Sequence, residues 1–300
     1  MAPALLACDW GTTNLRAWAL DEGGGVLAEK DFALGVSRLA PGEAAEVFEG
    51  QIRPALGAGS APAILCGMVG SNLGWQAVPY RDCPATCGDL AQALTEAAPG
   101  VRIVPGVRYA GFNGQGDVMR GEETQLFGWL ARHPEFAQGR RLVCHPGTHT
   151  KWMVVEDGRL IAFVTAMTGE LFAVLRAHSV LKSDAPPGDN AAFAEGLAAA
   201  GDGAALAARL FTARARVVGQ GRRAEDTPSY LSGLLIGADV AASPGLLGCD
   251  LAQGVALLGD ASLCGLYARA LGIRGVEAQV FDGEAAAVAG LWALHQARAG

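Results

Sequence analysis

Short apolar runs separated by polar, glycine-containing turns open the chain. Residues 4–9 are mostly apolar and end in Asp9, residues 15–20 are largely apolar after a Gly-Thr-Thr-Asn turn, and residues 26–32 form a third run after a Gly-rich turn. Runs of this length, bounded by turn residues, are typical of β-strands. The pattern therefore predicts a three-stranded meander at the start of the chain.

Helical and strand-like segments alternate through the rest of the first half. Apolar residues at helical spacing predict a helix over residues 43–56, and further helices are expected over 89–98 and 121–132. Two short strands are expected over 63–66 and 102–105. Alternation of this kind indicates an α/β domain.

The opening pattern returns after residue 134. Three more strands are expected, over residues 141–144, 151–156 and 159–164, with a Gly-Thr turn after the first and a Gly turn after the second. Repetition on this scale is a strong sign of a duplicated architecture. The sequence therefore predicts two α/β domains, 1–132 and 133–300, with a cleft between them.

The end of the chain has a different pattern. From Gly169 onward it is expected to be mostly helical, with a last helix over 283–298. The exception is an apolar strand over 254–258. The second domain is therefore expected to carry most of the helices.

Composition and charge narrow the classes of function. A formal net charge of −7 without a basic stripe argues against nucleic acid as the main partner. The sequence shows no apolar stretch of membrane-spanning length and no signal-peptide pattern. Most of the seven cysteines stand in apolar runs, as buried thiols do. We therefore expect a cytoplasmic protein whose partners are small molecules, with no nucleic acid and no membrane among them.

The first Gly-Thr turn has the chemistry of a phosphate site. Asp9 stands where a strand ends, beside Gly11, Thr12 and Thr13. Glycine allows the backbone to approach an anion closely, and a carboxylate beside such a turn suits a hydrated Mg²⁺ that bridges phosphate oxygens. Taken alone, the Gly-Thr-Thr sequence favours an ordinary hairpin turn.

The second Gly-Thr turn has the same character. Gly147 is followed by the donors Thr148, His149 and Thr150 and by the cation Lys151. Lys151 could neutralise phosphate charge, or it could be a strand residue that faces solvent. No P-loop sequence occurs, and no dinucleotide-binding glycine motif opens either half. Two such turns, one in each half, could bind the phosphate tail of one nucleotide from both sides.

These stretches carry a resemblance to a known family. DWGTTNLR at 9–16 resembles the first phosphate motif of the actin, hexokinase and Hsp70 superfamily, and GTHTK at 147–151 resembles its second. Beyond the superfamily, the chain resembles the 2-dehydro-3-deoxygalactonokinases. The matching stretches follow one order through nearly the whole chain, at residues 9–16, 67–72, 74–75, 79–80, 119–126, 146–149, 151–152, 168–171 and 231–238.

The resemblance implies a fold and a reaction. The fold would consist of two RNase H-like domains of the actin-like ATPase type with an interdomain cleft, the sugar acid in 1–132 and the nucleotide in 133–300. The reaction would transfer a phosphoryl group from Mg²⁺-bound ATP to the C6 hydroxyl of 2-dehydro-3-deoxy-D-galactonate. The product would be 2-dehydro-3-deoxy-6-phospho-D-galactonate, formed in galactonate and galactose catabolism.

The resemblance also implies roles for particular residues. Asp9 would anchor the metal ion, and Glu122 would act as the catalytic base, with Asp117 as second candidate. Glu122 could equally be a favourable dipole partner at a helix start. The phosphates and ATP would be bound by Gly11, Thr12, Thr13, Gly147, Thr148, His149, Thr150, Lys151 and Gly259. Gly259 lies where the superfamily has a Gly pair, with Asp260 in the second position.

The expected sugar-acid site draws on residues that follow the first-half strands. The candidates are Asn14, Arg16, Gly70, Ser71, Asn72, Trp75 and Arg120. Arg16, or alternatively Arg120, could bind the substrate carboxylate as a bidentate partner. Trp75 could cover an apolar face of the sugar acid, or it could be a core aromatic.

Other functions fit parts of the pattern. A kinase of the same fold could act on another sugar acid or an amino sugar, and an actin-like nucleotide-binding regulator would use the same turns. The Gly-Glu-Glu stretch at 121–123 is also similar to that of the exopolyphosphatases. The sequence leaves open whether the chain forms a homodimer.

Overall fold

The computed structural model describes residues 2–299, which divide into two compact units. Unit 1 consists of the described residues up to Arg140, together with Val155–Ala162 and those from Asp282 on. Unit 2 consists of Arg141–Val154 and Phe163–Phe281. The sequence predicts a single boundary after residue 132, whereas the contacts within the chain return its last helix to unit 1.

Unit 1 is built on a six-stranded sheet in the order β3-β2-β1-β4-β7-β6. Its strands are β1 (Leu5–Trp10), β2 (Leu15–Leu20), β3 (Val26–Phe32), β4 (Ala63–Cys66), β6 (Thr95–Ala98) and β7 (Val101–Ile103). β1 pairs antiparallel with β2 and parallel with β4, and β2 pairs antiparallel with β3. The predicted opening meander is therefore confirmed.

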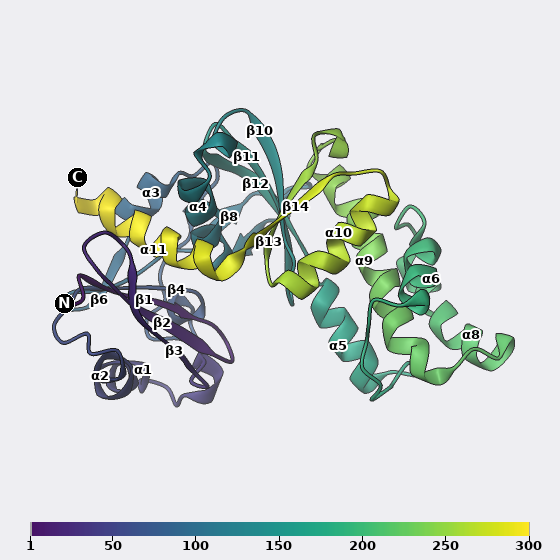
Figure 1. Cartoon of the computed structure of the whole chain (residues 1–300), viewed down its shortest axis with the longest axis horizontal. Helices are drawn as coiled ribbons and strands as arrows, with labels where there is room; N and C mark the ends of the chain where they lie inside the picture. The colour runs from purple at the N-terminus through teal and green to yellow at the C-terminus, as the bar shows by residue number, and fades with distance from the viewer. Residues whose placement is uncertain (1, 300) are drawn as a thin grey trace. The chain divides into compact units, whose positions relative to one another are not determined.

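Helices cover both faces of this sheet (Figure 1). On one face lie α1 (Ala44–Val47), the π-helical turn η2 (Phe48–Ile52) and α2 (Arg53–Ala55), which form one continuous helical segment as predicted. Phe48 and Ile52 pack there against buried residues of the sheet. The other face carries α3 (Cys87–Gln92), α4 (Glu122–Arg132) and α11 (Gly283–Ala299).

Two glycines let α4 and α11 approach each other closely. A Cβ at Gly128 of α4 would lie 1.8 Å from the Ala286 carbonyl oxygen, and one at Gly290 of α11 would lie 2.0 Å from the Thr124 carbonyl oxygen. Because non-bonded atoms cannot approach so closely, neither helix could keep its place with a larger residue. This packing is the reason why the last helix belongs to unit 1.

The expected helix over residues 89–98 is wrong in its second half. Helix α3 ends at Gln92, and Thr95–Ala98 forms the edge strand β6, antiparallel to β7. Thr86 caps the helix and exchanges hydrogen bonds with Asp89, which fixes its start. A small third sheet consists of β5 (Arg81–Asp82), β8 (Val107–Tyr109) and β9 (Asp117–Met119).

Unit 2 is built on a five-stranded sheet in the order β12-β11-β10-β13-β14, and the ends of β11 and β12 belong to unit 1. The strands are β10 (Arg140–His145), β11 (Thr150–Glu156), β12 (Arg159–Ala166), β13 (Val255–Gly259) and β14 (Ala278–Asp282). β10 pairs parallel with β13. Both large sheets thus have the order third, second, first, fourth, which confirms the predicted duplicated α/β fold. β14 was not predicted.

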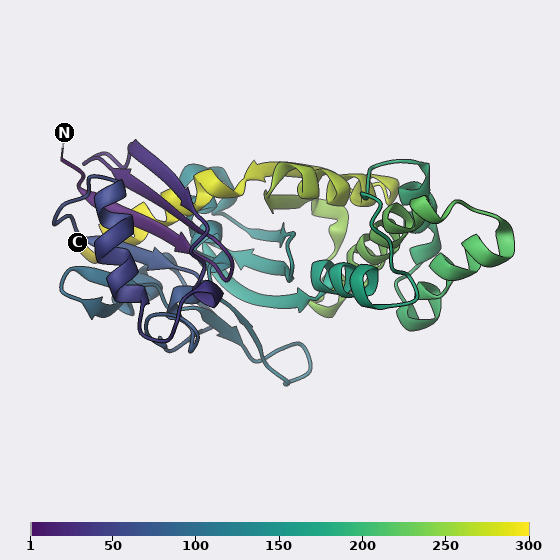
Figure 2. The ribbon, with the colours of Figure 1, turned by 90° about the horizontal axis from the view of Figure 1, so that it is seen from below.

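The helices of unit 2 gather mainly between β12 and β13 in the sequence. They are α5 (Thr168–His178), α6 (Ala191–Ala200), α7 (Leu206–Leu210), α8 (Thr212–Gln220), α9 (Thr227–Leu246) and α10 (Ala261–Ile273). Figure 2 shows the green helices α6 to α9 grouped to one side of the teal strands β10–β12. No helix in the described part of the chain is long and apolar enough to cross a membrane.

Short 3₁₀ turns complete the structure at η1 (Val36–Arg38), η3 (Met68–Gly70), η4 (Pro134–Phe136), η5 (Ala224–Asp226) and η6 (Leu251–Gln253). Two of them matter for the sites described below. η1 packs against the first Gly-Thr turn, and η3 follows β4 directly.

The close approach of α4 and α11 predicts a stability difference between two Gly→Ala variants. Gly128→Ala is expected to destabilise the protein by at least about 2 kcal/mol, because the new methyl group overlaps the backbone of α11. Gly50→Ala is the matched control, since Gly50 lies in η2, is exposed and has open space around it. Equal midpoints of the two variants in urea unfolding would contradict this packing.

Candidate functional site

Three backbone segments of unit 1 meet at the end of β1. A Cβ on Gly67, which follows β4, would lie 3.0 Å from Asp9 Oδ1, and one on Gly121, which precedes α4, would lie 3.4 Å from Gly67 Cα. Both glycines have positive φ, +87° and +114°, which larger residues rarely adopt. The start of α4 is thereby brought beside Asp9.

Asp9 lies in an acidic environment. Its pKa is raised to about 6, first by burial and then by the negative charge of the neighbouring Glu122 carboxylate. A hydrogen bond from the Cys66 thiol and the positive charge of Arg16 oppose this rise. Arg16 and Cys66 are its register partners on β2 and β4. Glu122 is partly exposed and accepts a hydrogen bond from the Arg120 backbone N–H, at 3.1 Å. Asp9 and Glu122 therefore form a pair of carboxylates at the strand end.

Glu123 is a member of this group that the sequence did not single out. It is fully buried and accepts hydrogen bonds from the Gly121 N–H, at 2.7 Å, and from the Thr124 hydroxyl, at 3.1 Å. Burial, followed by the charge of Glu122, raises the pKa of Glu123 to about 8. At neutral pH it is therefore mostly protonated, and it leaves the negative charge to Asp9 and Glu122.

Asp117, the second candidate base, is the first residue of β9, the strand that precedes α4. It pairs with Tyr109 in the sheet register, and its Oδ1 accepts a hydrogen bond from the Val118 N–H, at 2.7 Å. The carboxylate that raises the pKa of Asp9 is Glu122. The structure thus brings Glu122 together with Asp9.

The first Gly-Thr turn is held from behind by η1. The carbonyl oxygens of Thr12 and Thr13 accept hydrogen bonds from the N–H groups of Ser37 and Gly35, each at 3.0 Å. A Cβ on Gly35 would lie 2.1 Å from the Thr13 carbonyl carbon, so only glycine fits there. Thr12, Thr13 and Asn14 are exposed, which leaves their side chains available to a ligand.

The two candidate arginines differ in how much of their hydrogen-bonding capacity is used. Arg16 forms ion pairs with Asp31 and Glu284, at 3.0 and 2.8 Å. The guanidinium of Arg120 donates one hydrogen bond, to the Val78 carbonyl oxygen at 2.8 Å, and stacks on the Tyr80 ring. Its Nε and Nη1 are buried without a partner among the described residues.

The other candidates, in the segment after β4, differ in their exposure and in their contacts. Gly70 has Arg120 Nη1 against it, since a Cβ there would lie 2.8 Å from that nitrogen. The Ser71 hydroxyl donates to the Met68 carbonyl oxygen, at 2.8 Å, and Asn72 is exposed. Trp75 packs on Phe48 and on the core of unit 1. In this structure Trp75 therefore has the contacts of a core aromatic residue.

The second Gly-Thr turn divides between exposed and buried residues. Thr148 and His149 are exposed, and His149 contacts Glu170, with 2.5 Å between Nε2 and Oε2. Thr150 is fully buried and hydrogen-bonded to Tyr267. Lys151 is only 5% exposed and donates to the Thr165 hydroxyl, at 2.8 Å. The alternative that Lys151 faces solvent is therefore wrong.

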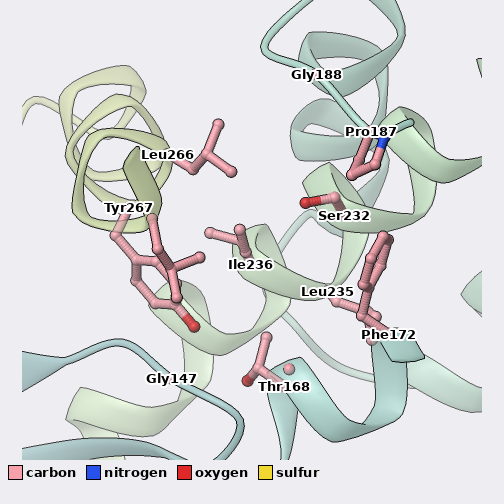
Figure 3. Close-up of a pocket in the computed structure, with 12 residues that line it drawn as sticks. Gly147, Thr168, Phe172, Pro187, Gly188, Ser232, Leu235, Ile236, Leu266 and Tyr267 are labelled. Atoms are coloured by element: carbon pink, nitrogen blue, oxygen red, sulfur yellow. The ribbon is translucent and has the colours of Figure 1, made fainter. Parts of the chain in front are cut away.

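An apolar pocket of about 190 Å³ adjoins Gly147 in unit 2 (Figure 3). Its walls come from α5, α9 and α10 and from the segment before α6. The lining residues are Gly147, Thr168, Gly169, Phe172, Pro187, Gly188, Ser232, Leu235, Ile236, Leu263, Leu266 and Tyr267. A pocket of mainly apolar walls with a few hydroxyl groups is the usual form of a small-molecule site.

Gly259, the remaining glycine predicted for the nucleotide half, lies beside the second turn. Gly259 has φ +149°, and a Cβ there would lie 3.6 Å from the Pro146 carbonyl oxygen, beside the second turn. Asp260, which replaces a glycine of the usual pair, caps α10 by accepting a hydrogen bond from the Leu263 N–H. Gly233, in the matching stretch 231–238, packs α9 on α6, since a Cβ there would lie 2.1 Å from the Phe193 carbonyl oxygen.

The donor set agrees with a cation that is bound mainly through phosphate and water. No group of three or more His, Cys, Asp or Glu side chains within residues 2–299 is arranged to hold a metal ion. Mg²⁺ in phosphotransferases commonly uses one or two carboxylates together with waters and phosphate oxygens. Asp9, partly buried at the strand end, fits that use.

Comparison with known proteins gives consistent matches. A family model described as 2-keto-3-deoxy-galactonokinase matches residues 9–294. A Rhizobium meliloti (strain 1021) protein named as a probable 2-dehydro-3-deoxygalactonokinase is 36% identical over 300 residues, covering 97% of this chain and 96% of its own. The 2-dehydro-3-deoxygalactonokinase of Escherichia coli (strain K12) is 35% identical, with 99% of each chain covered. A crystal structure from Sinorhizobium meliloti that bears this name provisionally has a TM-score of 0.86 at 35% identity, with 98% of each chain covered.

Duplicated sheets of this order, each with a glycine–threonine turn after its first strand, are the framework of a phosphotransferase of the actin-like ATPase fold. Within that class the matches are specific. The chain belongs to the 2-keto-3-deoxy-galactonokinase family, and it is a sugar-acid kinase that uses ATP. The fold, the kinase activity and the family predicted from the sequence are thereby confirmed.

The buried Glu123 predicts a pH dependence of stability. Its pKa is higher in the folded protein, at about 8, than the ordinary value of 4.5, so the folded state binds the proton more tightly. The stabilisation is complete below about pH 4.5 and is lost as pH rises toward 8, by up to about 1.4 kcal/mol per pH unit. Glu123→Gln, which keeps an acceptor for the Gly121 N–H, is expected to flatten this slope. Urea unfolding of both proteins from pH 5 to 8 measures it, and parallel slopes would show that Glu123 is not the group responsible.

Proposed function

We propose that this chain transfers the γ-phosphoryl group of ATP to the C6 hydroxyl of 2-dehydro-3-deoxy-D-galactonate. The observation that carries the proposal is the pair formed by Asp9 and Glu122 at the end of β1, in a chain of this family. Phosphoryl transfer depends mainly on positioning and on neutralising charge, and it needs few reacting side chains. Two carboxylates with different partners are enough, one to bind the metal ion and one to accept the hydroxyl proton.

Glu122 is the proposed base. It is partly exposed, whereas Glu123 beside it is buried and mostly protonated at neutral pH. As the C6 oxygen forms its bond to the γ-phosphorus, the bond from that phosphorus to the β–γ bridging oxygen breaks and ADP leaves. The hydroxyl proton passes to the Glu122 carboxylate. Glu122 is held for this task by its hydrogen bond from the Arg120 N–H.

Asp9 is the proposed anchor of Mg²⁺. When bound, the ion would neutralise the charge that develops on the phosphate oxygens. Cys66 donates a hydrogen bond to Asp9, and Arg16 lies beside it in the sheet; both favour its charged form. The carboxylate is thereby kept ready to bind a cation, although burial opposes its charge.

The nucleotide is assigned to the pocket and turns described above. The proposed phosphate contacts are the exposed residues Thr148, His149, Thr12 and Thr13. The adenine ring of ATP would occupy the pocket beside Gly147. Thr150 and Lys151 are buried, so their proposed role is to hold the second turn from behind.

Arg120 is the better candidate for the substrate carboxylate. Two of its nitrogens lack hydrogen-bond partners, whereas Arg16 has two acidic partners. Rotation of the guanidinium away from Gly70 would bring these donors to a carboxylate, which a planar guanidinium binds with two parallel hydrogen bonds. The free cysteines agree with a reducing compartment, and we propose that the enzyme works in the cytoplasm.

Substrate turnover tests the proposed function. We expect ATP consumption, measured with a coupled assay, to be fastest with 2-dehydro-3-deoxy-D-galactonate in a panel of 2-dehydro-3-deoxy sugar acids. The product should carry phosphate on C6 by ³¹P NMR. A higher kcat/KM for another sugar acid would make that compound the preferred substrate. Phosphate on another hydroxyl would contradict C6 as the acceptor position.

Removing the charge of Asp9 should abolish most turnover while the fold survives. Asp9→Asn is expected to lower kcat by about 100-fold or more, because a Mg²⁺ ligand is lost where charge stabilisation contributes several kcal/mol. Circular dichroism should be unchanged. Wild-type kcat in a folded Asp9→Asn protein would remove Asp9 from the metal site.

Glu122→Gln and Asp117→Asn form a matched pair for the catalytic base. Glu122→Gln is expected to lower kcat by about 10²–10⁴-fold, the usual contribution of general base catalysis. Asp117→Asn should change kcat by no more than a few-fold. The reverse order in steady-state kinetics would transfer the base to Asp117.

A further inference from the structure

A buried carboxylate in unit 2 joins four separate segments behind the second turn. Asp239, in the middle of α9, is 6% exposed. Its Oδ1 accepts hydrogen bonds from Trp152 Nε1 of β11, at 2.9 Å, and from the Ser243 hydroxyl, at 2.6 Å. Its Oδ2 accepts hydrogen bonds from the Thr168 hydroxyl, at 2.8 Å, and from the Tyr267 hydroxyl, at 2.7 Å. Four donors surround one carboxylate, and an ionised carboxylate is the side chain that can accept all four.

One branch of this network leads directly to the turn. Because the Tyr267 hydroxyl donates its proton to Asp239, its oxygen accepts from the Thr150 hydroxyl, at 2.8 Å. The Thr150 oxygen in turn lies 3.5 Å from the backbone nitrogen of Gly147, which donates to it. The direction of each bond along this path is thus set by Asp239.

A second branch reaches the same turn through the start of α5. Thr168, bound to Asp239, begins that helix, and the Glu170 N–H donates to the Thr148 carbonyl oxygen, at 2.9 Å. Between them, a Cβ on Gly169 would lie 2.5 Å from the Gly147 carbonyl oxygen. The turn is therefore fixed against the helix start, and the helix start is fixed to Asp239.

The same bonds shape the wall of the pocket beside Gly147. Thr168 and Tyr267 line it, and both direct their hydroxyl groups to Asp239. Among the lining side chains, Ser232 is the remaining hydroxyl group. Figure 3 shows Thr168 and Tyr267 on one side of the pocket and Ser232 on the other.

We propose that Asp239 is a positioning residue for nucleotide binding, which holds the Gly147–Thr150 turn in its binding shape through Tyr267 and Thr168. The proposal rests on the assignment of ATP to this turn. Asp239 would touch neither the nucleotide nor the sugar acid. It acts through the geometry of the turn, so its loss should weaken nucleotide binding and leave the affinity for the sugar acid unchanged.

Tyr267→Phe and Ser243→Ala form the matched test. Each variant removes one hydroxyl group that donates to Asp239, but only Tyr267 connects Asp239 to Thr150. Tyr267→Phe is expected to raise the KM for ATP and the Kd for ADP about tenfold, the usual effect of one lost buried hydrogen bond. The KM for the sugar acid should stay within about twofold. Ser243→Ala should leave all three constants within about twofold, although both variants lower the urea midpoint.

The outcomes are separable. If Tyr267→Phe and Ser243→Ala change ADP binding equally, or neither changes it, Asp239 has only a stabilising role and the proposal is overturned. Absence of ADP binding by the wild-type full-length chain in calorimetry would instead overturn the assignment of the nucleotide. Thr168→Val tests the second branch, and it too should raise the KM for ATP.

Discussion

A buried carboxylate loses several kcal/mol of hydration unless donors surround it, and each unit of this protein contains one, Glu123 in unit 1 and Asp239 in unit 2. In unit 2, Asp239 solves the problem with four donors. In unit 1, Glu123 solves it by keeping its proton, while Asp9 has a thiol and an arginine beside it. The two solutions give different chemistry. The first makes a rigid support for a turn, and the second leaves negative charge on Asp9 and Glu122, the residues that we propose for the cation and for the hydroxyl proton.

Glycines make these arrangements geometrically possible. Gly67 and Gly121 bring the start of α4 to the end of β1, Gly35 admits η1 behind the first turn, and Gly169 brings α5 against the second. A Cβ on Gly35 or Gly169 would overlap the backbone of a Gly-Thr turn, and one on Gly67 would lie 2.8 Å from the Trp10 carbonyl oxygen, while Gly121 needs glycine for its positive φ. The high glycine content therefore reflects close packing around the sites, together with ordinary loop turns.

Local patterns were sufficient for the framework of the fold and for the two turns. The meander and its repeat could be predicted because apolar runs and turn residues are neighbours in the sequence. β14 and β6 could not, because these edge strands are defined by pairing with β13 and β7 and carry no continuous apolar run. Asp239 was missed because its donors lie as far as 87 residues away. The available signal was a lone acid within the apolar helix α9, which demands buried partners. The pairing of Asp9 with Glu122 rests on tertiary contacts that no local pattern records.

The assignment of Glu122 and of the two turns can be examined in one measurement. A crystal structure of the full chain with 2-dehydro-3-deoxy-D-galactonate and an unreactive ATP analogue would locate both ligands at once. We expect a Glu122 carboxylate oxygen within about 3 Å of the C6 hydroxyl, the distance that general base catalysis requires. We also expect the adenine ring of the ATP analogue beside Gly147 and Ser232. A C6 hydroxyl bound by Asp117, with the Glu122 side chain directed away from the sugar acid, would contradict the assignment of Glu122 as the catalytic base.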